Sequence, residues 1–313
     1  MTLVILIIKI YLMTTTMRNF KTIFAFLGLL LISTTTNMMA QSPSALDTLK
    51  SQINTDIVFD FPAPIPDFSY SNPKASTKLS GEELFQYLHA ITGYGKIAAD
   101  KSQYTTSKSY MYSKADNITC NGRPGIITFY SLICANGASS NGADYNELSD
   151  GNGDGTYNDE INVEHLWPQS AFNQSYPMRA DLHHLRPTFT KPNNMRSNYP
   201  FAEVSDWDYS TSVGSKRGDQ EFEPTDSVKG DVARAMLYFV VRYYDRNIRG
   251  SMDYTDFWIN RVEMFLKWNR QDPPDANERR RNDLVEAFQC NRNPFTDDYT
   301  LADKVGALVF KSH

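Results

Sequence analysis

The segment between residues 163 and 198 constrains the fold of this chain more than any other, because strand, turn and helix signals follow one another within it. Residues 163–167 can form a short strand, which must end before Pro168 because proline donates no hydrogen bond to a β-ladder. Residues 182–185 offer a second strand, and residues 191–198 have the polar start of a short helix. The segment therefore predicts the order strand, strand, helix.

Polar side chains in the same segment can place a hard cation beside a base. Glu164 offers a carboxylate oxygen and Asn193 an amide oxygen, which suit Mg²⁺ or Mn²⁺ better than zinc. With these two groups on the metal, His165 is left free. It can act as the base, since an imidazole has an unperturbed pKa of about 6.5 and is largely neutral at pH 7. Neighbouring strand residues point to opposite faces, so Glu164 and His165 can share one site only at a strand end. Such a site has the minimum equipment for phosphodiester cleavage.

Longer motifs resemble those of the bacterial endonuclease I family, which are secreted or periplasmic non-specific nucleases with a ββα-metal (His-Me) finger. The resemblance covers about residues 79–295, and besides the finger it is carried by residues 222–235, 268–274, 279–282 and 291–295. It implies an endonuclease that hydrolyses phosphodiester bonds of DNA, and also of RNA, with one Mg²⁺ and leaves 5′-phosphate ends. Mn²⁺ or Ca²⁺ is expected to substitute for Mg²⁺ in the site.

The resemblance also implies roles within the finger. Glu164 corresponds to a metal ligand and His165 to the general base that activates water. The second protein ligand of the family is an Asn that lies six residues past a Pro that ends the second strand. Counting from Pro187 points to Asn193 as this ligand, and not to Asn194.

Arginines are the expected contacts to the substrate. The family uses one arginine against the phosphate, and Arg179, in the short loop between the two strands, is the first candidate for this catalytic role. Arg186 and Arg196 are the alternatives, and we assign both to substrate binding. Arg234 and Arg242 share one face of a predicted helix and are assigned to backbone phosphates, although a solvated helix face explains them equally well. Backbone contacts carry no base information, so we expect little sequence preference.

The N-terminal region predicts an exported protein. Residues 17–33 form a charged start followed by an apolar core, and small and polar residues then lead to a cleavage position after Ala40. A membrane anchor is the alternative, since residues 3–12 are also apolar, but neither run reaches the roughly 20 residues that a spanning helix needs. We therefore expect residues 1–40 to be a signal peptide, with Met17 as an alternative start, and the mature protein to be secreted or periplasmic.

The mature chain is expected to be acidic. Removal of residues 1–40 takes away three of the 31 Lys and Arg residues and no acid, which leaves 28 against 36 Asp and Glu, or a formal charge of −8. Net charge bears on solubility and long-range steering, and it does not exclude a local site for nucleic acid. We expect a monomer that binds nucleic acid as its substrate and is not held in a membrane.

Helical periodicity dominates the rest of the chain and predicts a mainly helical α+β domain with a small β-sheet. One helix is predicted to begin after Ser80. Three others are predicted over about residues 228–243, 256–268 and 278–289. The clearest strand covers residues 126–133, which are mostly β-branched and aromatic. We assign residues 41–78 to an extended Pro- and Ser-rich arm and residues 79–313 to a single catalytic domain, with the finger at about residues 161–200.

Three cysteines fit an exported protein with one disulfide. Cys120 and Cys134 would close a short loop, which contributes roughly 3 kcal/mol in the chain-entropy model. Cys290 is left free, and it stands where the family resemblance leads us to expect a glycine. The local turn at Cys290 therefore departs from the family pattern.

Other ligands and functions need to be weighed against the nuclease. Asp150 and Asp154 belong to a stretch that resembles the start of a calcium loop, but the Glu of its twelfth position is missing, so we expect at most a weak structural Ca²⁺ there. A zinc-dependent hydrolase would use His165, His183 and His184, but alternate strand residues face apart and no acidic water activator stands beside them. An exported nucleic-acid-binding protein without cleavage is the other alternative, and the intact finger argues against it.

Overall fold

The computed structural model describes residues 78–93, 101–136, 149–150 and 160–313. They belong to a compact unit that spans Phe68–His313. The predicted signal peptide lies outside the described residues, as does the predicted arm apart from its last residue. None of the helices in the described ranges combines the length and the apolar character that a membrane span requires.

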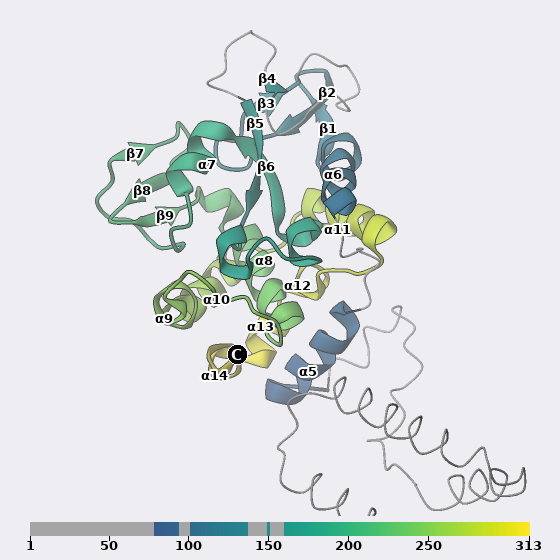
Figure 1. Ribbon diagram of the computed structural model, residues 1–313, viewed down its shortest axis with the longest axis vertical. Helices are drawn as coiled ribbons and strands as arrows, with labels where there is room; N and C mark the ends of the chain where they lie inside the picture. The colour runs from purple at the N-terminus through teal and green to yellow at the C-terminus, as the bar shows by residue number, and fades with distance from the viewer. Residues whose placement is uncertain (1–77, 94–100, 137–148, 151–159) are drawn as a thin grey trace, which may run out of the picture. The chain divides into compact units, whose positions relative to one another are not determined.

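Helix α8, Lys229–Tyr243, is buried on almost every face and forms the centre of the larger hydrophobic cluster. Helices α5, Gly81–Thr92, and α10, Val262–Gln271, pack against it (Figure 1). The other described α-helices are α6 Lys101–Tyr110, α7 Thr190–Arg196, α9 Tyr254–Phe257, α11 Ala276–Gln289, α12 Pro294–Asp297, α13 Leu301–Val305 and α14 Ala307–Ser312. The helices predicted after Ser80 and over residues 228–243 and 278–289 are therefore confirmed.

The described strands form three small antiparallel sheets. The first contains β1 Asn117–Cys120, β2 Arg123–Ile127 and β3 Cys134–Ala135. The second contains β4 Ser149–Asp150, β5 Glu160–His165 and β6 Leu185–Phe189. The third contains β7 Tyr209–Ser210, β8 Lys216–Gly218 and β9 Glu221–Glu223. The predicted α+β class is confirmed, with three short sheets instead of one.

The strand predicted over residues 126–133 is shorter than expected. β2 ends at Ile127, and the chain turns back so that Cys134 pairs with Ile127. Leu132 lies in this turn with a φ of 52°, a left-handed conformation that no strand continues through. The turn brings Cys134 to Cys120, and the predicted disulfide between them is present. The pairing of β2 with β3 therefore ended the strand at Ile127, although the β-branched composition favoured a longer one.

The helix predicted over residues 256–268 is interrupted. α9 ends at Phe257, a 3₁₀ turn follows over Ile259–Arg261, and α10 begins only after that turn. Trp258, at the break, has φ −122° and ψ −61°. Its buried indole N–H donates to the main-chain oxygen of Phe310 at 2.9 Å. This anchoring of the indole accompanies the break, and the sequence pattern carried no sign of it.

Replacement of Cys290 by glycine is expected to stabilise the protein by about 1 kcal/mol. Cys290 follows α11 with φ 60° and ψ 29°, the left-handed conformation that a Cβ atom disfavours and glycine adopts freely. The departure from the family pattern is therefore a strained helix end. Urea unfolding of Cys290→Gly measures the effect. Ala287→Gly, an exposed position inside the same helix, is the control and should destabilise the protein. Equal losses of stability in both variants would contradict the prediction.

Candidate active site

The ββα order is present between Glu160 and Arg196. β5 pairs antiparallel with β6, and α7 packs against both strands (Figure 1). β5 ends at His165, so the Glu164–His165 pair lies at a strand end. Pro168, which cannot continue a ladder, follows within three residues.

The second strand begins later than the sequence predicts. Leu182–His184 forms a 3₁₀ turn, because the Asp181 carboxylate accepts a hydrogen bond from a backbone N–H of the turn at 3.0 Å. The strand therefore covers Leu185–Phe189, and Pro187 lies inside it instead of ending it. The spacing from Pro187 still places Asn193 on α7, the helix that packs on the two strands.

The carboxylate, the imidazole and the amide singled out in the sequence line one pocket with a volume of about 310 Å³. Glu164 and His165 reach it from the end of β5, and Asn193 reaches it from α7. Asn193 is half-buried, whereas its neighbour Asn194 is exposed. The other lining residues are Val163, Pro168, Gln169, Ser170, Asn194, Arg196, Ser197 and Asn198.

Glu164 is buried and held through one of its two carboxylate oxygens. The Tyr130 hydroxyl donates to Oε1 at 2.8 Å, and Nη1 of Arg196 lies 3.1 Å from the same oxygen. Burial raises the pKa of Glu164, while Arg196 and Tyr130 oppose that rise. Oε2 receives neither of these donors, and a cation bound there would favour the charged carboxylate further.

His165 presents a neutral ring in a defined tautomer. Nε2 lies 3.1 Å from the main-chain oxygen of Arg179, and a carbonyl oxygen can only accept, so Nε2 carries the proton. Nδ1 is then the unprotonated nitrogen, and it is buried without a protein partner among the described residues. Burial lowers the pKa of His165 well below its ordinary value, and His184, whose ring centroid is 5.4 Å away, lowers it further. The ring is therefore neutral at neutral pH.

Arg179 lies beside His165, as its position in the loop between the strands suggested. Its guanidinium stacks on the Tyr104 ring at 4.6 Å, and its Nε is buried without a described partner. The Tyr104 ring, on α6, is also 5.6 Å from the His165 ring. Sequence reasoning missed Tyr104, because the polar segment around it carries no apolar periodicity and lies far from the finger along the chain.

Comparison with known proteins agrees with this geometry. The family model for endonuclease I matches residues 89–299, which is more than half of the chain. The chain belongs to the endonuclease I family. It is 37% identical over 158 residues to an extracellular ribonuclease of Bacillus amyloliquefaciens, an alignment that covers 46% of this chain and 53% of the relative.

Two further relatives extend the comparison. An extracellular ribonuclease of Bacillus subtilis (strain 168) is 36% identical, over 46% of this chain and 53% of the relative. A periplasmic deoxyribonuclease of Aeromonas hydrophila is 30% identical, over 38% of this chain and 48% of the relative. The chain spans about half the length of the curated relatives it matches. Their names agree with the prediction of a nuclease located outside the cytoplasm.

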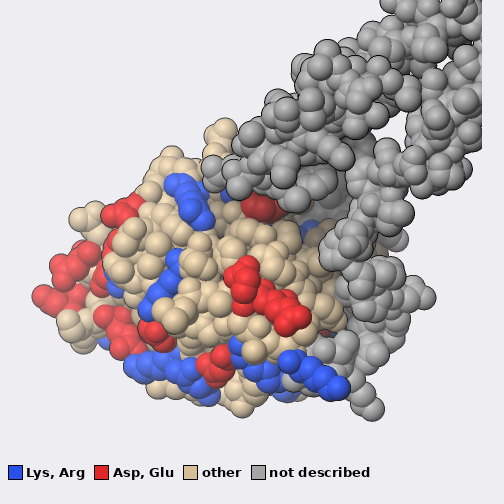
Figure 2. Space-filling model, turned by 90° about the horizontal axis from the view of Figure 1, so that it is seen from below, with Lys and Arg blue, Asp and Glu red and all other residues tan. Residues whose placement is uncertain are grey.

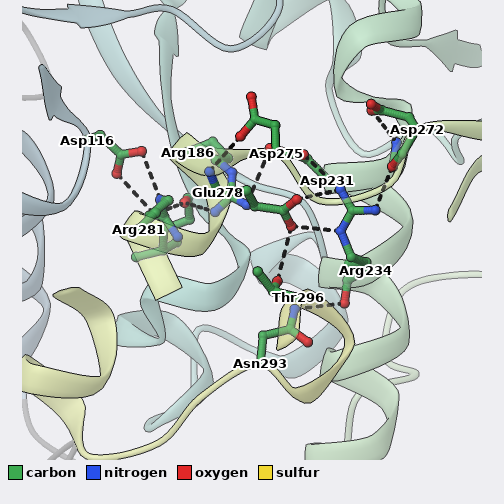
Figure 3. A network of polar contacts seen from close by, with 12 residues as sticks. Asp116, Arg186, Asp231, Arg234, Asp272, Asp275, Glu278, Arg281, Asn293 and Thr296 are labelled. Carbon is green, nitrogen blue, oxygen red and sulfur yellow. Dashed lines mark hydrogen bonds and ion pairs between the residues drawn. The ribbon is translucent and has the colours of Figure 1, made fainter. Parts of the chain in front are cut away.

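Two arginines of this endonuclease I family member that the sequence assigned to substrate binding are buried near the finger. Arg196 is 1% exposed; besides Glu164 it binds the main-chain oxygen of Leu166 at 2.6 Å, so it holds the chain just after β5. Arg186 is 5% exposed, and its Nη2 lies 4.0 Å from Asp231 on α8 (Figure 3). Both guanidinium groups have partners inside the protein, and Arg196 also lines the pocket, so their assignment to substrate binding stays a prediction.

Arg234 and Arg242 on α8 are also interior. The Nε of Arg234 donates to Glu278 of α11 at 2.8 Å (Figure 3). Arg242 donates to Asp181 at 2.9 Å. Both side chains are buried, and each is paired with a carboxylate, as a buried charge requires. They therefore form neither the phosphate-binding face nor the solvated face that was considered from the sequence.

Exposed basic residues of the C-terminal third are largely matched by acids. Figure 2 shows Lys and Arg side chains beside Asp and Glu side chains on the face seen from below. The exposed pairs include Arg270 with Asp303 at 2.6 Å, Lys267 with Glu203 at 2.6 Å and Lys311 with Glu263 at 3.1 Å. Pairs of this kind contribute little to stability. Basic composition in this region therefore does not identify a nucleic-acid surface.

The pocket fits a hard divalent cation in the endonuclease I family member. One carboxylate oxygen of Glu164 and the amide oxygen of Asn193 would hold a cation that keeps several waters, which is the coordination that Mg²⁺ favours. Within the described ranges no group of three or more His, Cys, Asp or Glu side chains is placed to hold a metal. The calcium-loop stretch considered from the sequence lies outside the described residues, apart from the backbone of Asp150.

The zinc-hydrolase hypothesis requires His183 and His184 as metal ligands together with His165. Nε2 of His183 lies 3.0 Å from the main-chain oxygen of Asn291, and Nε2 of His184 lies 2.6 Å from that of Met178. Both rings are buried and donate to carbonyls through Nε2, and in the described part of the chain no three His, Cys, Asp or Glu side chains are placed to hold a metal. The zinc-hydrolase reading is therefore not supported by the geometry.

His183 should make the protein sensitive to acid. Burial lowers its pKa from 6.5 to about 3, with Asp181 opposing the change, so below pH 6.5 the unfolded chain binds a proton that the folded chain excludes. Stability is therefore present above pH 6.5 and lost as the pH falls. Relative to His183→Asn, the native protein should lose about 2 kcal/mol between pH 7 and pH 5. Urea unfolding at both pH values measures this difference, and parallel pH profiles would contradict it.

Proposed function

We propose that this chain is an exported, divalent-cation-dependent endonuclease that hydrolyses phosphodiester bonds of DNA and RNA with little sequence preference. The observation that carries the proposal is the single pocket lined by Glu164, His165 and Asn193. Family membership supports it, and the relatives include proteins named as ribonucleases and as a deoxyribonuclease. Their extracellular and periplasmic names support export.

His165 is the general base in this proposal. Its Nδ1 takes a proton from water, the water oxygen attacks phosphorus, and the bond from phosphorus to the 3′ oxygen breaks. The 3′ oxygen is then protonated from solvent, and the phosphate stays on the 5′ end. A Mg²⁺ held by Glu164 and Asn193 would supply positive charge beside the scissile phosphate and the departing oxygen. Burial of His165 favours this role, because it keeps the imidazole neutral.

Glu164 and Asn193 are the proposed ligands, with Mn²⁺ or Ca²⁺ as substitutes for Mg²⁺. Asn193 is preferred to Asn194 because a half-buried amide loses less freedom on binding a cation than an exposed one. Arg179 is the proposed phosphate contact. The Tyr104 ring holds its guanidinium near His165, and its buried Nε has no described partner.

The mature protein, incubated with supercoiled plasmid and with RNA in the presence of Mg²⁺ or of EDTA, tests this function. We expect nicked, then linear, then short DNA products and degraded RNA with Mg²⁺, and intact substrates with EDTA. Product ends should be labelled by polynucleotide kinase only after phosphatase treatment, as 5′ phosphates require. Binding without cleavage would support the alternative of a silent binding protein, and cleavage that survives EDTA would contradict the metal chemistry.

A further inference from the structure

Tyr130 connects the proposed metal ligand to the rest of the fold. It lies in the turn between β2 and β3 and is fully buried. Its hydroxyl donates to Oε1 of Glu164 at 2.8 Å, and Arg196 binds the same oxygen. Two donors on one oxygen restrict the rotation of the carboxylate and leave Oε2 as the oxygen for another partner. Sequence reasoning did not single out Tyr130.

The third sheet holds Tyr130 through its backbone. The hydroxyls of Ser215 and Thr211 donate to the main-chain oxygen of Tyr130 at 2.7 Å and 3.1 Å. Ser215 in turn accepts from the backbone N–H of Thr225 at 2.9 Å. The ring of Tyr130 packs 4.7 Å from Phe222 of β9. Hydrogen bonds to the main chain of Tyr130 and from its side chain therefore connect the loops around β7–β9 to the Glu164 carboxylate.

We propose that Tyr130 is a positioning residue for the divalent-cation site and that the β7–β9 sheet keeps it in place. The inference rests on the proposed function, because it takes Glu164 as a cation ligand. Hydrogen bonds to a ligand carboxylate fix its orientation before the cation arrives, and their loss typically weakens metal binding by roughly 10- to 100-fold. The third sheet, which lies outside the finger, thereby contributes to metal affinity.

Calorimetric titration of Mn²⁺ into the protein without nucleic acid tests this inference, with Tyr130→Phe and Ser215→Ala as variants. Tyr243→Phe is the matched control. Its hydroxyl is also buried and donates to a carboxylate, Asp181, at 2.7 Å, but Asp181 is not among the residues that line the pocket. Urea unfolding of every variant measures the accompanying loss of stability.

We expect Tyr130→Phe to weaken Mn²⁺ binding by roughly 10-fold or more, Ser215→Ala to weaken it less, and Tyr243→Phe to leave it unchanged despite a similar loss of stability. Native Mn²⁺ affinity in both Tyr130→Phe and Ser215→Ala would overturn the inference, as would equal weakening in Tyr243→Phe. If Tyr130→Phe fails to fold, Ser215→Ala alone decides. Absence of Mn²⁺ binding by the native protein would overturn the proposed metal site itself. The titration of the native protein therefore tests the metal site, and the variants test the role of Tyr130.

Discussion

Replacement of His165 by alanine is expected to lower kcat for plasmid cleavage by roughly 10²- to 10⁴-fold, the usual contribution of a positioned general base. The reason is specific to one atom. Nε2 is committed to the Arg179 carbonyl, so Nδ1 is the nitrogen that can take the proton from water. Single-turnover rates at saturating Mg²⁺ measure the effect, and Mn²⁺ affinity should stay near the native value because the imidazole is not a ligand.

His89→Ala is the matched control for this prediction. The His89 ring also meets a main-chain oxygen, that of Val241 at 2.8 Å, but it belongs to α5 and does not line the pocket. Its loss should leave kcat within a few-fold of native. Partial recovery of His165→Ala by added imidazole would identify the missing group as the base. A rate for His165→Ala equal to that of the control would rule out the proposed mechanism.

Replacement of Asp181 by alanine is expected to destabilise the protein by about 3–5 kcal/mol, the cost of breaking a buried ion pair and leaving one charge unpaired. Asp181 has no exposed surface, and its Oδ2 accepts from Arg242 at 2.9 Å, from Tyr238 at 2.8 Å and from Tyr243 at 2.7 Å. Its Oδ1 accepts from Gln289 at 2.7 Å. Arg242 holds the pKa of Asp181 below its usual range against the effect of burial.

Urea unfolding at pH 7 measures this loss. Glu263→Ala removes a carboxylate that pairs with Lys311 on the surface, and it should cost less than about 1 kcal/mol. Asp181 joins the loop of the finger to α8 and to the end of α11, so its loss should loosen all three. A change in Asp181→Ala no larger than that in Glu263→Ala would contradict the role of this carboxylate as the centre of the network.

Local signals in the sequence were enough to predict several elements. Pro168 cannot continue a ladder, and β5 does end just before it, at His165. Apolar residues spaced at the helical period predicted α8, because that spacing places them on one side of a helix. Local signals failed where a distant group intervened. The Asp181 carboxylate capped a turn where a strand was expected, and the anchored indole of Trp258 marks the break between α9 and α10.

By itself the sequence determined the family, the α+β class and the carboxylate, imidazole and amide that meet in the pocket, because these follow from residue types and short spacings. Only the tertiary structure decided how each group is used. Spacing put Arg234 and Arg242 on one helix face, but whether that face meets water or carboxylates depends on elements that pack there from elsewhere in the chain. The tautomer of His165 and the support of Glu164 by Tyr130 likewise come from residues outside β5, whose contacts form only when the chain has folded.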